Sequence, residues 1–284
     1  MLSFKVCTYH IKFDDSDQIY EKIFNLTSKI NKKYCELNNY SYVSTLYNEN
    51  IFDHLIDDEI FKIDRKWDKA CIFKYKYLLD ILNTSNEDYI VYVEYDACFC
   101  NTIKKLEDYV DDYHSIFCSR CNWTYDVQKW IKDFIKMLNF IKDNENKILN
   151  FDTCSDILAS KELLENFVLL NSYFLSNEGF YIFKNNEISK KFLKAVVKYS
   201  PLFYDNLKNY CVETQTVQFI MKKDLFRPYL KVLPPKTQGH IRGESNKFNE
   251  DECLVCHNSS IDKNILYQFL ISILKNKYWE KFDL

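Results

Sequence analysis

Glycine and proline are scarce in this sequence, with three Gly and four Pro among 284 residues. No proline-rich or low-complexity segment interrupts the chain, in which hydrophobic residues make up 47%. Such a chain can bury enough apolar surface to offset the entropy cost of ordering its backbone. The composition therefore argues against disorder and predicts a folded protein with a sizeable core.

An excess of positive charge is also missing. The chain has 38 basic and 41 acidic residues, for a formal net charge of −3. Proteins that bind nucleic acids in general carry a basic excess that neutralises phosphates, so this balance argues against that class. A few local lysines or a bound metal ion could still hold an anionic ligand.

Long apolar runs are absent at the N-terminus, where MLSFKVCTYH leads directly into an expected strand. This run is too short for a signal peptide or a membrane anchor. We therefore expect a cytoplasmic protein, compatible with a microbial or viral source. Its thiols should be reduced, because disulfides form mainly in secreted proteins.

Cysteines, by contrast, are numerous. Among the eleven, two C-x-x-C pairs could together form a zinc site: Cys118 with Cys121, and Cys253 with Cys256. The second pair lies in an apolar run that is typical of a strand, where residues three apart point to opposite faces. We therefore favour small buried side chains for these cysteines, with zinc as the alternative.

Hydrophobic periodicity predicts alternating strands and helices. The first third of the chain follows the order strand, helix, strand, helix, strand, which is typical of a largely parallel sheet with helices on its faces. The predicted strands are 3–9, 40–46, 89–93, 116–119, 180–183, 229–232 and 254–257. The predicted helices are 18–38, 66–82, 187–199, 214–222 and 261–278, and the charged stretch 127–170 is predicted to be mostly helical.

Two carboxylates leave the predicted strand 89–93 one residue apart, in the sequence YIVYVEYDACF. Ligands of open α/β sheets bind at the carboxyl ends of the strands, so Glu94 and Asp96 lie where a site is expected. Holding two like charges together is costly unless a cation lies between them. A Mg²⁺ or Mn²⁺ ion that bridges them to a diphosphate meets this need, and a pair of solvated loop acids is the alternative.

A second polar group follows another predicted strand. His257 ends the strand 254–257, and Ser260 and Lys263 follow it at three-residue intervals. A histidine at a strand end is commonly a structural residue, and that interpretation stays open. Lys263, however, begins the last helix, where the helix N-terminus and the ammonium group both favour a phosphate.

Taken in order, these segments resemble the GT-A glycosyltransferases, particularly the retaining galactosyl-, mannosyl- and xylosyltransferase family of fungal mannan and plant xyloglucan synthesis. They also share traits with the glycogenin-like family. NKKYCELNNYSY is similar to that family's N-x-x-Y-A-x-x-H-G-Y run, and KWDKA to its W-x-K helix start. EYD at 94–96 stands where the family has D-x-D, and NEGFYIFKN at 177–185 resembles N-x-G-x-F-L-x-R-N. VETQT at 212–216 and HNSSIDK at 257–263 resemble acid-x-Gln and H-x-x-G-x-x-K.

The resemblance covers most of the chain and implies a GT-A-like α/β fold. It implies a single Rossmann-like nucleotide-sugar-binding domain, with a mixed, mostly parallel sheet flanked by helices. Within it we expect a nucleotide-sugar-binding half at 1–125, a helical insertion or cap at 126–170, and an acceptor-side half with the C-terminal helix at 171–284. The stretch 127–170 matches no part of the family pattern, so we expect it to cover the acceptor side.

The resemblance also implies roles for particular residues. Asp96 and His257 would bind Mn²⁺ or Mg²⁺, Glu94 would share the metal or hold the ribose, and Lys263 would contact the diphosphate. The other assignments are Thr8 and Tyr9 to the nucleobase pocket, Lys69 to the phosphate or the acidic tripeptide, and Glu213 and Gln215 to the reacting face of the sugar. Glu213, Gln215 and Asp96 are the expected catalytic residues. An ordinary surface lysine is the alternative for Lys69, and a capped helix start for Glu213 and Gln215.

Two departures from the family pattern affect the expected site. Glu94 replaces an aspartate and is one methylene longer, which could shift the metal or the ribose contact. Ser260 replaces a glycine that lets the backbone approach the phosphates, so that loop should fit them less closely. Neither change removes a charge.

The sequence thus predicts a metal-dependent glycosyltransferase that moves a hexose or pentose from a nucleotide sugar to a glycan, a protein-linked acceptor or another hydroxyl group. The expected nucleotide is UDP and the expected stereochemistry is retention, both by resemblance. An inactive sugar-nucleotide-binding protein and a zinc-stabilised interaction module are the alternatives.

Overall fold

The computed structural model describes residues 2–13, 18–56, 58–120, 176–206, 212–221, 224–234, 236–239, 249–257, 262–282 and 284. The insertion or cap predicted at 126–170 lies outside these residues, as do Cys121 and Ser260. The division of the chain into two halves and a cap therefore stays a prediction. Within the described residues, no helix is both long and apolar enough to cross a membrane.

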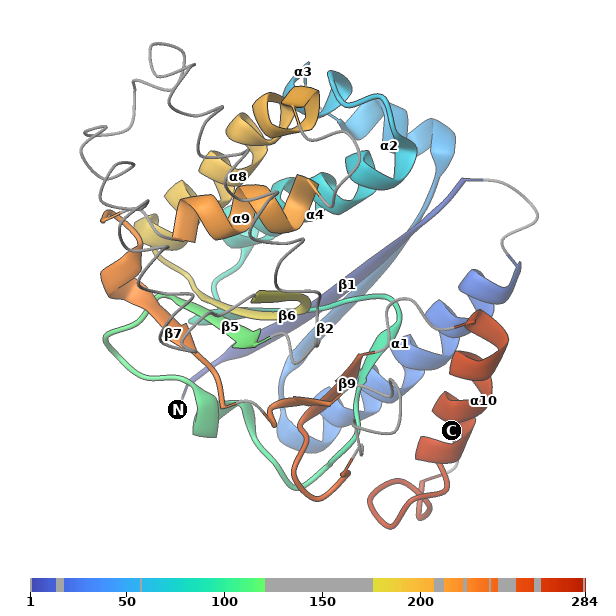
Figure 1. Ribbon diagram of the computed structural model, residues 1–284. Coiled ribbons are helices and arrows are strands. Elements are labelled where there is room, and N and C mark those ends of the chain that lie inside the picture. The colour runs from blue at the N-terminus through green and yellow to red at the C-terminus, as the bar shows by residue number, and fades with distance from the viewer. Residues whose placement is uncertain are drawn as a thin grey trace, which may run out of the picture.

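A six-stranded sheet forms the centre of the described chain, in the order β2-β1-β3-β6-β5-β7 (Figure 1). β1 runs parallel to β2 and β3, and β5 runs parallel to β7, whereas β6 is antiparallel to both of its neighbours. The mixed, mostly parallel sheet that the sequence predicts is therefore confirmed. The strands are β1 (Phe4–Lys12), β2 (Ser41–Asn48), β3 (Tyr89–Val93), β5 (Ile116–Arg120), β6 (Ser176–Lys184) and β7 (Leu230–Val232).

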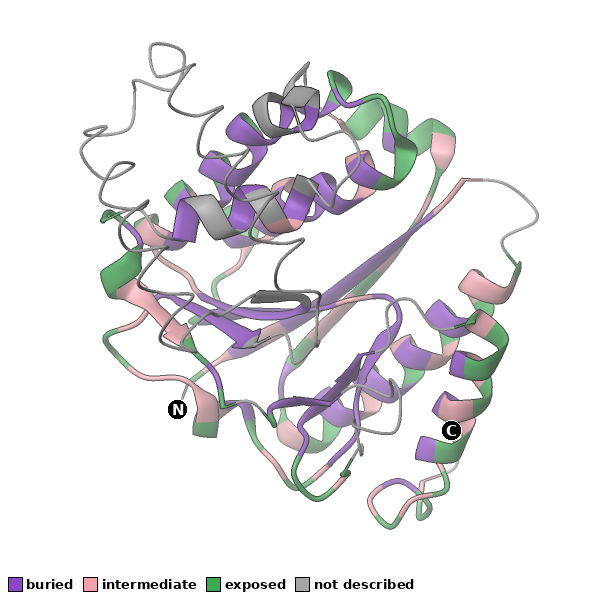
Figure 2. Cartoon of the chain, in the orientation of Figure 1, coloured by how far each residue is buried: buried purple, intermediate pink, exposed green. Residues whose placement is uncertain are grey.

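Helices cover both faces of this sheet (Figure 1). One face carries α2 (Glu49–Leu55), α3 (Asp58–Phe61), α4 (Lys66–Thr84), α8 (Glu187–Asn206) and α9 (Val212–Met221). The other carries α1 (Gln18–Asn38), α10 (Lys263–Ile273) and a second, smaller sheet. The helices turn buried faces toward the sheet and exposed faces outward (Figure 2), so each side of the sheet has its own hydrophobic core.

β3 shows how the sequence produces these two cores. All five of its residues are buried. Ile90 and Tyr92 pack into the core under α4, whereas Tyr89, Val91 and Val93 pack into the core beneath α1. A strand that is apolar on both faces belongs in the middle of a sheet covered by helices. The residues after Val93 therefore emerge at the centre of the carboxyl edge of the sheet.

The smaller sheet has the order β4-β9-β8, with β4 (Ala97–Phe99), β8 (Gln238–Gly239) and β9 (Val255–His257). Within β4, Ala97 lies directly opposite His257. The free edge of β4 is satisfied by the Asn31 side chain of α1, which donates to the Ala97 carbonyl at 3.1 Å and accepts from the Phe99 amide at 3.0 Å. An amide side chain thus replaces a neighbouring strand and ties β4 to α1.

Some boundaries differ from those predicted. β1 continues to Lys12 because it pairs with β2 over its whole second half, and α8 continues through Pro201. α10 ends at Ile273 instead of 278, since the Asn276 side chain accepts from the Tyr278 and Trp279 amides and turns the chain. The sequence did not predict the short elements: α2, α3, β4, β8, and the 3-10 turns Leu106–Tyr109 and Arg227–Tyr229.

Candidate metal centre and adjoining pocket

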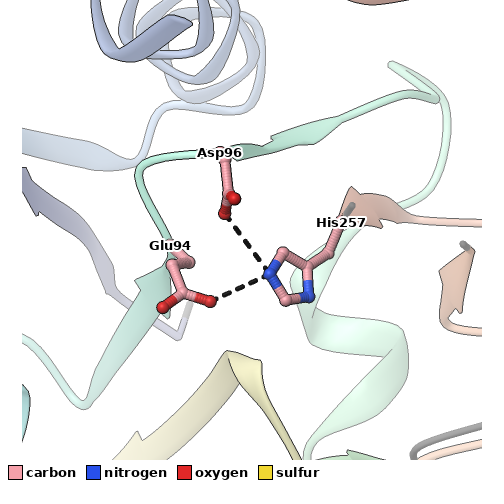
Figure 3. A group of neighbouring side chains, drawn as sticks. All are labelled: Glu94, Asp96 and His257. Atoms are coloured by element: carbon pink, nitrogen blue, oxygen red, sulfur yellow. Dashed lines mark ion pairs between the residues drawn. The ribbon is translucent and has the colours of Figure 1, made fainter. Parts of the chain in front are cut away.

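Glu94, Asp96 and His257 meet at the carboxyl end of β3 (Figure 3). The Nε2 atom of His257 lies 2.9 Å from Glu94 Oε2 and 3.3 Å from Asp96 Oδ1. Asp96 and His257 are buried, and Glu94 is half-buried. One potential ligand atom from each residue lies within 4.8 Å of the other two. The two sequence segments that were expected to form a metal site therefore do come together.

The backbone that carries the two carboxylates is held on several sides. The Glu94 amide donates to the Gly179 carbonyl of β6 at 3.0 Å, and the Ala97 amide donates back to the Glu94 carbonyl at 2.9 Å. Between them, the Tyr95 carbonyl accepts from the hydroxyl of Thr27 on α1 at 2.6 Å. Glu94 and Asp96 therefore project from a tight turn that is anchored to both β6 and α1.

Each carboxylate also has a lysine partner. Lys263 Nζ lies 2.8 Å from Asp96 Oδ2, and Lys74 Nζ lies 3.6 Å from Glu94 Oε1. Burial would raise the pKa of Asp96, but Lys263 and His257 hold it well below its ordinary value. Burial likewise opposes ionisation of Glu94, but Lys74 and His257 hold its pKa low. Both acids are thus kept as carboxylates, the form that binds metal.

The imidazole of His257 is the third ligand candidate. Burial alone would lower its pKa, but the Asp96 and Glu94 carboxylates raise that pKa to about 9. The free ring is thus held protonated between the two carboxylates, and a metal ion that binds Nε2 would take the place of that proton. Two carboxylate oxygens and one imidazole nitrogen that converge on one point suit Mn²⁺, and Mg²⁺ less closely. The residues present therefore fit the divalent ion that the resemblance implies.

A cavity of about 190 Å³ adjoins this centre and opens beside Glu94 and Lys74. Most of its surface is apolar and aromatic, as expected for a pocket that takes a flat or partly apolar ligand. Its lining residues are Tyr9, His10, Ile11, Phe13, Tyr20, Trp67, Ala70, Cys71, Lys74, Tyr92, Glu94 and Tyr95.

Of the two residues that were assigned to the nucleobase pocket, Tyr9 lines this cavity and Thr8 does not. The Tyr9 hydroxyl donates to the Ala70 carbonyl of α4 at 2.6 Å, which fixes the ring against the wall of the pocket. Thr8 is buried, and its carbonyl accepts from the Tyr77 hydroxyl at 3.2 Å.

His10 also lines the cavity, and the sequence analysis did not single it out. Its ring centroid lies 4.8 Å from that of Tyr95, and its Nε2 atom has no hydrogen-bond partner among the described residues. Burial lowers the pKa of His10 to about 4, so the ring is neutral at neutral pH. The imidazole in the wall of the pocket is therefore uncharged, and its Nε2 atom is buried.

The lysine that contacts the acidic tripeptide is Lys74, to which the sequence analysis gave no role. The Lys69 ammonium lies 5.0 Å from the ring centroid of Phe61, whereas Lys74 contacts the acidic tripeptide through Glu94. Lys74 is only 1% exposed, and its Nζ atom also lies 2.7 Å from Glu213 Oε1. A lysine among the apolar residues of a helix is rarely so buried unless it is paired. Its place on the core-facing side of α4 was the available sequence signal.

Glu213 lies in the first turn of α9, and Lys74 links it to the metal centre by pairing with both Glu213 and Glu94. Its Oε1 atom accepts from Lys74 and, at 2.9 Å, from the Tyr75 hydroxyl. Burial raises the pKa of Glu213, and Lys74 opposes that rise. For Lys74 itself, burial is outweighed by the Glu213 and Glu94 carboxylates, which hold its pKa well above the ordinary value. The side chain of Gln215 lies outside the described part of the structure.

The cysteines of the two C-x-x-C pairs are buried, as favoured above, wherever they are described. Cys118 packs into the core on one face of the large sheet, and Cys253 and Cys256 pack into the core on the other face. These three thiols therefore do not gather around one zinc ion, and Cys121 lies outside the described residues.

No family model matches the sequence, and no curated protein sequence matches it. Solved structures do match. A glycosyltransferase involved in the glycosylation of the major capsid of PBCV-1 is 9% identical, with a TM-score of 0.54 over 95% of this chain and 99% of that chain. The galactosyltransferase LgtC, in complex with donor and acceptor sugar analogues, is 7% identical, with a TM-score of 0.53 over 94% and 95%. These likenesses show a GT-A-type fold and do not single out the fungal and plant family.

Proposed function

We propose that this protein is a metal-dependent glycosyltransferase that uses a nucleotide-sugar donor. The observation that carries the proposal is the cluster of Glu94, Asp96 and His257 at the carboxyl end of β3, beside an aromatic pocket. In open α/β sheets this edge is where ligands bind. By resemblance, the donor is UDP-linked, the sugar is a hexose or pentose, the acceptor is a hydroxyl of a glycan or a protein-linked group, and configuration is retained.

The three ligand candidates would hold Mn²⁺ or Mg²⁺. When bound, such an ion supplies Lewis-acid stabilisation of the charge that builds on the departing diphosphate. Lys263 lies at the N-terminus of α10, so its ammonium and the helix dipole both favour the same anion. In this structure that ammonium pairs with Asp96, which places it at the edge of the metal centre.

The aromatic pocket would hold the base of the nucleotide. Tyr9, Tyr20 and Tyr95 supply ring surfaces against which a flat base can pack. The neutral His10 ring adds a further uncharged ring to the wall of this pocket. The base would then lie in the pocket and the diphosphate beside it at the metal centre, because the pocket and the metal centre share Glu94.

Glu213 would serve the reacting sugar. Because Lys74 lies between Glu213 and Glu94, it fixes the distance of this carboxylate from the metal centre. A buried, oriented carboxylate stabilises the positive charge that develops on the anomeric carbon during transfer. Lys74 thus orients Glu213 and prevents repulsion between the two acids.

A panel of nucleotide sugars would test the function directly. With Mn²⁺, we expect one UDP-sugar to raise the unfolding temperature and to be hydrolysed slowly without an acceptor. EDTA should abolish both effects and added Mn²⁺ should restore them. A nucleotide sugar that raises the unfolding temperature but is not turned over with any of the acceptors would favour the inactive sugar-nucleotide-binding protein. If no nucleotide sugar binds, the proposal is wrong.

Lys263→Ala should weaken the binding of UDP and of the UDP-sugar by similar factors, about ten- to hundredfold, because one charge-assisted contact is lost. Uridine, which has no phosphate, should bind almost unchanged. Isothermal titration with the three ligands measures this difference. Lys275→Ala, an exposed lysine just beyond the same helix, is the matched control and should change none of the affinities. An equal loss for uridine would make Lys263 a structural residue.

A further inference from the structure

Gly179 lies in β6, next to the strand that carries the metal centre. Its carbonyl accepts from the Glu94 amide at 3.0 Å, and the residue is buried. The three residues that follow it, Phe180, Tyr181 and Ile182, are large and buried. Glycine inside a buried strand costs conformational entropy and gives up packing, so it commonly marks a close approach of another group.

The group that approaches Gly179 is the ring of His257. A Cβ atom at position 179 would lie 2.4 Å from Nδ1, 2.6 Å from Cε1 and 2.7 Å from Cγ of that ring. All three distances are far below van der Waals contact, and the three atoms belong to one rigid ring that cannot bend away. The backbone of Gly179 does not have the positive φ that favours glycine, so an alanine here would be excluded by the ring alone.

His257 has little freedom to yield in another direction. Its backbone is fixed by the pairing of β9 with β4, where it lies opposite Ala97. Its Nε2 atom faces Glu94 and Asp96 (Figure 3). The opposite part of the ring is what a Cβ atom at position 179 would meet, so the ring lies between the carboxylates and Gly179. A side chain at position 179 would push the ring away from the site or along the strand.

We propose that Gly179 is the positioning residue of the metal centre: the space of its missing side chain lets the His257 imidazole sit with Nε2 facing both carboxylates. This inference rests on the proposed metal site, and it adds a residue that contacts neither the metal nor the substrate. Gly179 also holds the backbone of the metal centre, since its carbonyl accepts the hydrogen bond of the Glu94 amide.

A double-mutant cycle with Mn²⁺ binding as the readout tests the role. The free-ion signal in electron paramagnetic resonance gives the Mn²⁺ affinity of the wild type, Gly179→Ala, His257→Ala and the double variant. We expect Gly179→Ala to bind about ten- to hundredfold more weakly, the range for residues that orient a metal ligand, and His257→Ala, which removes a ligand, to bind at least as weakly. With His257 already replaced, Gly179→Ala should change the affinity by less than about twofold.

Ile182→Val is the matched control, because it shortens a buried side chain further along the same strand and lowers stability while position 179 stays glycine. It should keep the wild-type Mn²⁺ affinity. Wild-type affinity in Gly179→Ala, or an equal loss with and without His257, would overturn the positioning role. His257→Ala that binds Mn²⁺ like the wild type would instead overturn the proposed metal site.

Thermal unfolding covers the case in which Gly179→Ala does not fold. The double variant has no ring at position 257, so we expect it to fold with the stability of His257→Ala. That result would show that the ring occupies the space at position 179. A double variant that also fails to fold would show that Gly179 serves the sheet, and would overturn the proposal.

Discussion

Asp96→Asn should lower the turnover of the nucleotide-sugar donor by about a thousandfold, or about 4 kcal/mol of transition-state stabilisation. The amide keeps the size and shape of the carboxylate but loses the charge that binds the metal and faces Lys263. The substitution lies at a buried position where volume is conserved, so the protein should fold. Donor hydrolysis at saturating Mn²⁺, with circular dichroism of the same sample, measures both parts of this prediction.

Asp251→Asn is the control for this result. Asp251 also makes a close ion pair, with Lys277 at 2.6 Å, but on the surface and away from the metal centre. It should therefore keep full activity. Full activity in Asp96→Asn, or undiminished wild-type activity in EDTA, would remove the metal from the mechanism. Activity lost together with the folded spectrum would show only that Asp96 is needed for folding.

The metal centre could be predicted from the sequence, in part from strand ends and in part from the resemblance. Glu94 and Asp96 come directly after an apolar five-residue strand, and His257 ends another apolar run. Ligands of α/β sheets bind at the carboxyl ends of the strands, which marks Glu94 and Asp96 after β3. His257 ends β9 of the smaller sheet, which pairs with β4, so strand order does not place it there and its metal role follows from the resemblance. The resemblance likewise places Lys263, at the start of the helix that follows β9.

The residues that hold the metal centre in place could not be predicted from the sequence, because their contacts depend on packing between distant segments. Lys74 and Glu213 are 139 residues apart, and no periodicity relates one to the other. The contact of Gly179 with the His257 ring, and the pairing of Asn31 with the β4 edge, depend on the positions of single atoms. β4 and β8 have three and two residues, too few for a hydrophobic pattern.

The two hydrophobic cores also show what the sequence pattern predicts and what it does not. The alternation of Tyr89–Val93 between two cores follows from a continuous apolar run, which indicates a strand covered on both faces. Within α4, however, the helical period marks position 74 as core, whereas its residue is a lysine. Local pattern and residue type conflict there, and such conflicts are expected where a site requires a charge inside the protein.

Lys74→Met should lower the free energy of unfolding by about 3–5 kcal/mol, because it leaves the buried Glu213 without its cation. Methionine fills much the same space, so the loss measures the uncompensated charge and not a cavity. Urea denaturation monitored by circular dichroism gives the value. Lys76→Met on the same helix removes an exposed pair with Asp80 and should cost less than about 1 kcal/mol.

A second variant separates charge from packing. Adding Glu213→Gln to Lys74→Met removes one of the two carboxylates that Lys74 faces, so part of the lost stability should return. The double variant should still turn over the donor poorly, since the oriented carboxylate of Glu213 is missing, while UDP binds at the unchanged Lys263. If Lys74→Met costs no more than Lys76→Met, or if Glu213→Gln restores nothing, the buried lysine does not hold this acid in place. Within the described part of the chain, the Tyr75 hydroxyl would then be the remaining partner that orients Glu213.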